Sequence, residues 1–273
     1  MLNMNRAVKL VQCLFAIAII GFGVLHLITG DFISGHALIH DHTTIYLYWS
    51  YASGILFIIT GLLILIGKQI KLLLIADGII VFAWAFIPQF AGLIVHPVYT
   101  GVLTLTGKAL ALTGSFMIIA APMLVRHVKD TNRFWSYDYL DTKLTTIGLY
   151  FIGIFLLICG AQHFIFTAFC ASLVPAWIPG AMFWTYFAGV ALIAGGIGLM
   201  IKPTRPLAAA LSGIMILLWT VMLHFERVTA TNFHDYNEIT SFFETIAFGS
   251  ALLILPCQVY RRRSYYKSSV QIV

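Results

Sequence analysis

Charged residues are scarce in this chain. Asp, Glu, Lys and Arg together make up 10% of its 273 residues, while hydrophobic residues make up 60%. Because a soluble globular domain carries about 25% charged residues, this composition excludes an ordinary soluble domain. The mean hydropathy of +0.95 agrees, and the sequence predicts an integral membrane protein in contact with the lipid bilayer.

Several motifs that would indicate a particular chemistry are also missing. The four cysteines show no C-x-x-C spacing, which argues against a thiol redox pair or a zinc knuckle. There is no H-E-x-x-H, no C-x-x-C-H and no glycine-rich phosphate loop, so ATP-driven transport by this chain alone is not expected. The N-terminal apolar run lacks an A-x-A cleavage pattern, and we expect it to be retained as a helix.

Long apolar stretches dominate the sequence. A bilayer core about 30 Å thick is crossed by a helix of about 20 apolar residues, and eight stretches meet that length. We predict them near residues 7–29, 45–67, 71–91, 101–125, 143–166, 182–201, 206–225 and 239–260. The expected fold class is all-α integral membrane, with eight transmembrane helices.

The chain is similar to itself when shifted by 135 residues. Trp49 then falls on Trp184 and Gly54 on Gly189. The other matched pairs are Gly61 with Gly196, Trp84 with Trp219, and Gly114-Ser115 with Gly249-Ser250. Such self-similarity is typical of a duplication, so we predict two four-helix repeats, residues 1–130 and 131–273. Because four is an even number of crossings, the repeats should be parallel, related by a pseudo-two-fold axis along the membrane normal.

Basic residues indicate the orientation, because Lys and Arg accumulate on the cytoplasmic side. Fourteen of the 16 fall at one end of the predicted bundle, in segments 6–9, 68–71, 126–143, 202–205 and 261–267. We therefore expect a multi-pass membrane protein with both termini in the cytoplasm. Since this topology explains the pI near 9.2, no nucleic-acid partner is predicted.

Histidines gather at the opposite end, where eight of the nine are expected. His26 and His163 occupy matching positions at the ends of the first and fifth predicted helices. His224 ends the seventh helix where Gln89 ends the third. Imidazole can bond a quinone carbonyl or exchange protons near neutral pH, so we predict that these residues line a polar pocket facing away from the cytoplasm.

Lys108 and Glu244 carry charges inside predicted helices. A charge within the membrane is costly unless it is paired or hydrated, so each is a candidate pocket residue. In the repeat alignment Lys108 falls on the neighbour of Glu244, which makes an ion pair across the pseudo-two-fold axis one expectation and a role in proton or substrate handling another. Asp77, in the third helix, is expected either to reach the cytoplasmic interface or to bond a neighbouring helix.

A metal site is a further hypothesis, because imidazole suits copper, iron, zinc and haem. His36 and His40 are four residues apart, a spacing that one helical turn brings together, and Asp41 and His42 follow. A hydrated loop without metal is the alternative.

Stretches of the second half resemble a known family. They are Gly160-Ala161-Gln162-His163-Phe164, Val174-Pro175-Ala176-Trp177-Ile178-Pro179-Gly180 and the glycine-rich run 183–199. These motifs resemble the DoxX/DoxD-like family of small bacterial membrane proteins, usually single four-helix units, so the chain resembles two of them fused. The first half has the histidine-rich segment in place of the Val-Pro-x-Trp-x-Pro loop. The resemblance implies an inner-membrane subunit of a quinone-reducing or oxidative-stress complex, with a quinone-like ligand in a pocket built on His26 and His163.

Three functions follow from these observations. The first is a redox-associated, quinone-linked subunit with a redox partner, in which His26 and His163 converge on a closed apolar cavity. The second is a transporter or channel for a small solute or metal ion, with a polar path from Lys108 to Asp77. The third is a non-enzymatic scaffold for a periplasmic partner, with scattered and exposed histidines.

Overall fold

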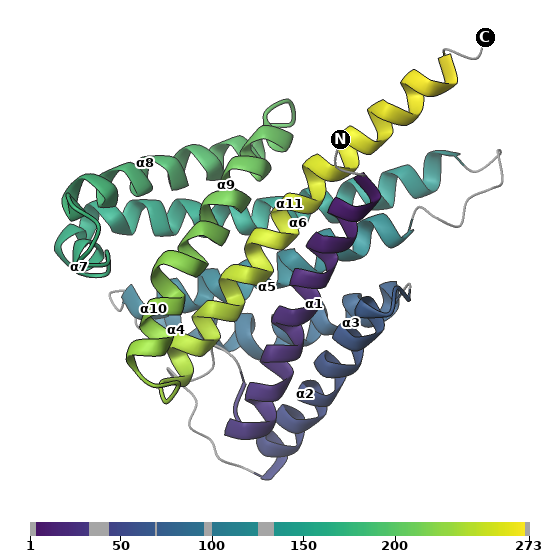
Figure 1. The fold of residues 1–273 in the computed structure, drawn as a ribbon. Helices are drawn as coiled ribbons and strands as arrows, with labels where there is room; N and C mark the ends of the chain where they lie inside the picture. The colour runs from purple at the N-terminus through teal and green to yellow at the C-terminus, as the bar shows by residue number, and fades with distance from the viewer. Residues whose placement is uncertain (1–3, 33–43, 69, 96–99, 125–133, 271–273) are drawn as a thin grey trace.

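A computed structural model gives the fold of the chain (Figure 1). It describes residues 4–32, 44–68, 70–95, 100–124 and 134–270. Within these ranges every regular element is a helix and none is a strand, which confirms the predicted all-α class for the described part of the chain.

The helices are labelled as in Figure 1. In chain order they are α1 (Met4–Thr29), α2 (Thr44–Leu65), α3 (Lys71–Val81), η1 (Phe82–Phe86), α4 (Ile87–Val95), α5 (Thr100–Leu124), α6 (Phe134–Ile165), α7 (Thr167–Ser172), α8 (Ala181–Met200), α9 (Arg205–Trp219), η3 (Thr220–His224), α10 (Phe225–Ala230) and α11 (Tyr236–Val270).

Eight helical segments in the described ranges are long and apolar enough to cross a membrane. They are Arg6–Thr29, Tyr46–Leu65, Lys71–Val95, Gly101–Ala121, Lys143–Ile165, Ala181–Met200, Arg205–Ala230 and Tyr236–Gln258. Their length and composition define a multi-pass membrane protein. The eight predicted stretches are confirmed, and each begins within three residues of its prediction.

Two of the spans end later in the chain than predicted. The third continues to Val95 and the seventh to Ala230. Each is interrupted by one turn of π-helix, η1 in the third span and η3 in the seventh, after which α-helix resumes in α4 and α10. A π turn accommodates an extra residue without ending the helix, so polar residues such as Gln89 and Glu226 belong to the helix and do not terminate it.

Helices α5 and α11 are the most widely connected in the bundle. α5 packs on α3, α6 and α11, and α11 packs on α1, α5 and α9. The remaining large interfaces join α1 to α2 and α6 to α8. Figure 1 shows α1 beside α11, with the start of α1 and the end of α11 at the same end of the bundle. The largest fully buried side chains include Phe15, Phe22, Phe57, Phe116 and Phe248.

Glycines allow close approach in two of these interfaces. A Cβ atom on Gly54 of α2 would lie 2.8 Å from the carbonyl oxygen of Gly23 and 2.9 Å from the Cβ of His26, both on α1. A Cβ atom on Gly189 of α8 would lie 3.0 Å from the Cβ of His163 on α6. Contacts this short leave no space for a methyl group. The two glycines therefore hold the two histidine-bearing helices against their neighbours.

Candidate functional site

A partly open cavity of about 620 Å³ lies among α5, α6, α7, α8, α9, η3 and α11. We call it the main cavity, and we call the end of the bundle that carries His26, His163 and His224 the histidine end. Ligand-binding pockets typically enclose about 300–1,000 Å³, so the main cavity is large enough for a small organic molecule.

The walls of the main cavity are mostly apolar. The apolar side chains on them are Phe155, Leu156, Phe166, Phe169, Leu173, Leu192, Ile216, Trp219, Leu223 and Phe248. The indole of Trp219 lies nearly parallel to the imidazole of His163, with ring centroids 6.4 Å apart and an angle of 18° between the planes. These flat surfaces suit a planar or isoprenoid ligand better than a hydrated ion.

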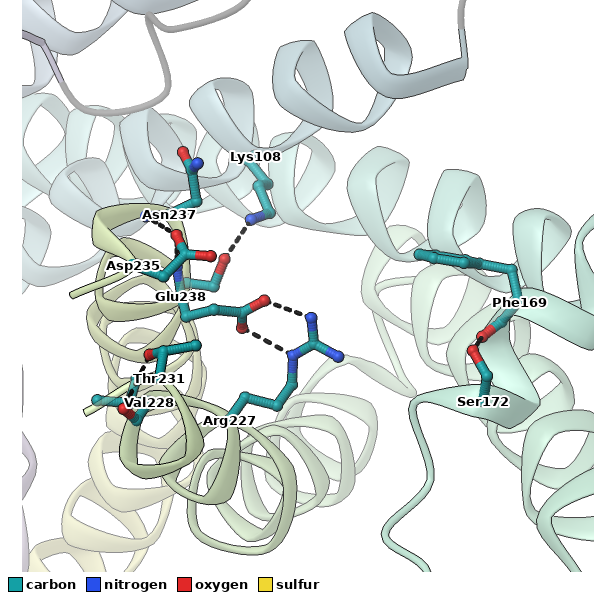
Figure 2. Close-up of polar contacts among 10 residues, drawn as sticks. Lys108, Phe169, Ser172, Arg227, Val228, Thr231, Asp235, Asn237 and Glu238 are labelled. Carbon is teal, nitrogen blue, oxygen red and sulfur yellow. Dashed lines mark hydrogen bonds and ion pairs between the residues drawn. The ribbon is translucent and has the colours of Figure 1, made fainter. Parts of the chain in front are cut away.

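A pair of opposite charges lies on the wall of the cavity. The Lys108 Nζ of α5 is 2.8 Å from Glu244 Oε2 of α11 and donates a hydrogen bond of 2.9 Å to Ser241 Oγ. The side chain of Glu244 is 1% exposed and that of Lys108 is 22% exposed. Figure 2 shows Lys108 extending from α5 toward the first turns of α11. An ammonium group has three protons, and the hydrogen bond to Ser241 uses one of them.

His163 lines the same cavity. Its Nδ1 lies 2.7 Å from the carbonyl oxygen of Cys159 one turn earlier on α6. A carbonyl oxygen only accepts, so Nδ1 carries the proton, and the neutral ring has its lone pair on Nε2. The neighbouring Gln162 exchanges hydrogen bonds with Thr104 of α5, with Gln162 Nε2 donating over 2.9 Å. Residues 162 and 163 thus add polar groups to a mainly apolar lining.

His224 closes the π turn η3 and also lines the cavity. Its Nδ1 is buried, and it has no hydrogen-bond partner in the described part of the chain. The extra residue of a π turn rotates the side chains that follow it around the helix axis, and such turns are frequent at functional sites. Thr220, at the start of the turn, fixes it to α11 through a 2.9 Å contact with the hydroxyl of Thr245.

Polar contacts brace the histidine end near the cavity. Arg227 of α10 forms a two-pronged ion pair with Glu238 of α11, in which Nε donates to Oε2 over 2.8 Å and Nη2 bonds Oε1. Figure 2 shows this pair below Lys108. The indole of Trp177 donates to Glu226 Oε2 over 3.2 Å. These contacts connect α10 to α11 and to the turn that follows α7.

His26 does not reach the main cavity. It is 1% exposed, and its Nδ1 lies 2.8 Å from Ser53 Oγ, whose own proton goes to the carbonyl oxygen of Ser50 at 2.8 Å. Since Ser53 has a single proton, His26 is the donor. The ring packs on Phe32 and Phe57 beside a separate void of about 10 Å³, which is about the space of one water molecule.

His26 and His163 therefore line two separate spaces in this structure, whereas one shared pocket was expected. α5 is the reason, because it lies between the two places. Ala109 and Leu112 of α5 line the void beside His26, while Thr104 and Lys108 line the main cavity. Each histidine is held against its own neighbouring helix by a glycine, and α5 contributes different residues to the two places.

The remaining site residues predicted from the sequence are Gln89 and the three metal candidates. Gln89, in α4, is 2% exposed and is not among the residues that line the main cavity. His36, His40 and His42, the metal candidates, lie outside the described residues. Among the residues that are described, no group of three or more His, Cys, Asp and Glu side chains is arranged to hold a metal ion.

Two cysteines of the main cavity were not singled out from the sequence. Cys159 lies on α6 and Cys170 on α7, and both line the cavity. Cys170 Sγ is 3.9 Å from the carbonyl oxygen of Gln162. Burial raises the pKa of the Cys170 thiol, so it is held as a thiol and is not an activated nucleophile. The helical spacing of Cys159, His163 and Phe166 was the available sequence signal, since residues three and four apart share a face.

Comparison with known proteins gives one partial match. Residues 152–232 match a family described as a domain of unknown function, DUF8561. The match covers less than half of the chain and runs from α6 to the end of α10, so it includes His163, Trp219 and His224 but neither Lys108 nor Glu244. No curated protein and no solved structure matches the chain.

Proposed function

We propose that the main cavity binds a small amphiphilic molecule of the quinone class, and that the protein is the membrane subunit of a quinone-linked redox system. The supporting observation is one cavity of about 620 Å³ that combines apolar walls with the paired Lys108 and the histidines 163 and 224. A quinone is flat and largely apolar, and it carries carbonyl oxygens that accept hydrogen bonds. These properties complement this lining.

The charge balance favours a neutral ligand. Glu244 offsets the charge of Lys108 at 2.8 Å, so the wall holds no net charge that would need an anion. Beyond its hydrogen bond to Ser241, Lys108 has protons to offer a carbonyl oxygen of the ligand. The Nε2 of a neutral His163 can accept a proton from the hydroxyl of the reduced form. One wall thus supplies a donor for a quinone and an acceptor for a hydroquinone.

The alternatives are less well supported by the same geometry. Transport calls for a polar path from Lys108 to Asp77, but Asp77 is not among the residues lining the main cavity. The next turns of α5 carry the buried apolar residues Ala109, Leu112 and Phe116. The buried hydroxyls of Thr113 and Ser115 on these turns bond to backbone carbonyls of α5 itself. A scaffold would have scattered, exposed histidines, whereas His163 and His224 line one cavity.

The wider architecture belongs to the same proposal. We infer a DoxX-like fusion of two parallel four-helix repeats in the inner membrane, with both termini in the cytoplasm and a redox partner at the histidine end. The paired glycine contacts, Gly54 with His26 and Gly189 with His163, support the repeats. Single cysteines introduced at Lys68 and Lys202 should then react with an impermeant thiol reagent only after the membrane is opened. Labelling in intact cells would show that the orientation is the opposite of the one proposed.

The test of the ligand begins with the purified protein. Its optical spectrum, metal content and extracted lipids are measured, and a short-chain quinone is titrated into ligand-free protein. We expect bound quinone, and an affinity reduced about 10-fold in His163→Ala, because losing one hydrogen bond of about 1.4 kcal/mol changes an affinity tenfold. His26→Ala is the matched control in the first half and should bind normally. Equal affinity in the wild type and in a His163→Ala, His224→Ala double variant would overturn the proposal.

A further inference from the structure

Asp77 is a buried carboxyl group that the proposed function does not use. It lies on α3 and is 0% exposed, and so is Thr60 on the neighbouring α2. The Thr60 hydroxyl faces the carboxyl. In the described part of the chain, neither the two carboxyl oxygens of Asp77 nor the hydroxyl oxygen of Thr60 forms a hydrogen bond with good distance and angles. Two polar groups therefore face each other within an apolar bundle.

In the described part of the chain, no ion pair joins this carboxyl to a cation. The elements packed against α3 are α2, η1 and α5. Their titratable side chains in the described ranges are Tyr46, Tyr48 and Tyr51 on α2 and Lys108 on α5. Lys108 is already bonded to Ser241 and Glu244. Tyr51 is nine residues from Thr60 on α2, a helical rise of about 13 Å.

On α3 itself, Lys71 is the nearest basic residue in sequence. It lies six residues from Asp77, which is a helical rise of about 9 Å. A carboxylate in a membrane interior is strongly disfavoured unless a cation or water compensates it, and such a group takes up a proton instead. The environment of Asp77 therefore favours the uncharged acid.

The second half of the chain holds a neutral pair at the same place. A shift of 135 residues puts Thr60 on Gly195 and Asp77 on Ser212. A Cβ atom on Gly195 would collide with the hydroxyl of Ser212, which is 3% exposed. α8 and α9 thus make the corresponding helix contact without any acid. Packing of this helix pair does not require a carboxyl group, so Asp77 calls for another explanation.

We propose that Asp77 is a proton-binding site: an uncharged carboxylic acid in the membrane interior whose hydroxyl is directed at Thr60. Its ligand is a proton, which the site keeps until water or an acceptor reaches α3. The site is separate from the main cavity, because Asp77 does not line it. Proton binding at Asp77 therefore does not depend on whether a quinone binds in the main cavity.

Infrared spectroscopy tests the protonation state directly. The carbonyl stretching band of a carboxylic acid is recorded at neutral pH for the wild type, Asp77→Asn and Asp77→Ser. We expect both variants to lose one acid band and no carboxylate band. Asp77→Ser introduces the residue of the second half and should keep the thermal unfolding temperature. Glu244→Gln is the matched control and should lose a carboxylate band, because Glu244 is paired with Lys108. Loss of a carboxylate band on replacing Asp77 would overturn the proposal.

A membrane-soluble carbodiimide gives a chemical test of the same site. The acid proton moves to a carbodiimide nitrogen while the carboxyl oxygen adds to the central carbon, and the adduct rearranges to a stable acylurea without a leaving group. Mass spectrometry should find this adduct on the peptide containing Asp77, and Asp77→Asn should lose it. Protection of Asp77 by sodium ions at constant pH would assign a cation site instead, and would overturn proton binding.

Discussion

The Lys108 ammonium of α5 lies 2.8 Å from the Glu244 carboxylate of α11 and joins the two most widely connected helices of the bundle. The residues are 136 positions apart in the chain. The pair therefore connects the first half of the molecule to the second, at the wall of the main cavity.

Breaking this pair should have unequal effects from its two sides. Lys108→Met strands a carboxylate that is 1% exposed, and removing one partner of a buried ion pair destabilises by about 3–5 kcal/mol. Glu244→Gln leaves an ammonium that is 22% exposed and still bonded to Ser241. We therefore expect this variant to lose about 2 kcal/mol of stability. Thermal unfolding in one detergent measures both. A Lys108→Met, Glu244→Leu double variant should recover most of the loss, and no recovery would contradict an ion pair.

Trp219 should report the ligand by fluorescence. Its ring lies on the wall of the main cavity beside His163, so a bound quinone should quench it by contact. Trp84, its counterpart in the first half, stacks on Phe32 at 5.7 Å and does not line the cavity. Quenching should therefore be reduced in Trp219→Phe and unchanged in Trp84→Phe. The same loss in both variants would show that the quenching is nonspecific.

His26 should matter for stability and not for the ligand. Replacement by Ala removes the hydrogen bond to Ser53 and the ring contacts with Phe32 and Phe57. A buried polar group left unsatisfied costs about 1–3 kcal/mol, and a lower unfolding temperature is expected. A ligand titration on the same sample should give the wild-type affinity. A selective loss of binding would instead place His26 in the ligand site.

Alkylation of Cys170 should depend on pH and on the ligand. The thiolate is the reactive form, and burial raises the pKa of this thiol. The fraction of thiolate is therefore small at neutral pH and grows as the pH rises, so the rate should still be increasing above the ordinary thiol pKa of about 8.5. Peptide mapping after timed alkylation measures this rate. Added quinone should slow the reaction at Cys170, and an unchanged rate would place the ligand elsewhere.

Much of the secondary structure could be predicted because it depends on local composition. The length of an apolar run decides whether a helix can cross a bilayer, and all eight spans were found in this way. The ends at Val95 and Ala230 were missed because polar residues such as Gln89 and Glu226 resemble helix ends. The π turns that carry the helix onward leave no clear mark in a single sequence.

The candidate site was predicted only in part. His163, His224, Lys108 and Glu244 were selected as polar residues in apolar surroundings, and the structure brings all four to one cavity. His26 was chosen by analogy with His163, yet it bonds to Ser53 and lines a separate small void. Similarity between two halves of a sequence shows that their residues correspond, but it does not show which correspondences face the same space.

The sequence by itself therefore determined that the chain is a bundle of apolar helices with rare polar groups inside it, because hydrophobic length and the cost of buried charge act on each segment separately. Only the tertiary structure decided which of those groups meet. That outcome depends on which helices pack closely, as at Gly54 and Gly189, and on which faces α5 and α11 turn toward the main cavity. These are contacts between residues far apart in the chain, and no local pattern specifies them.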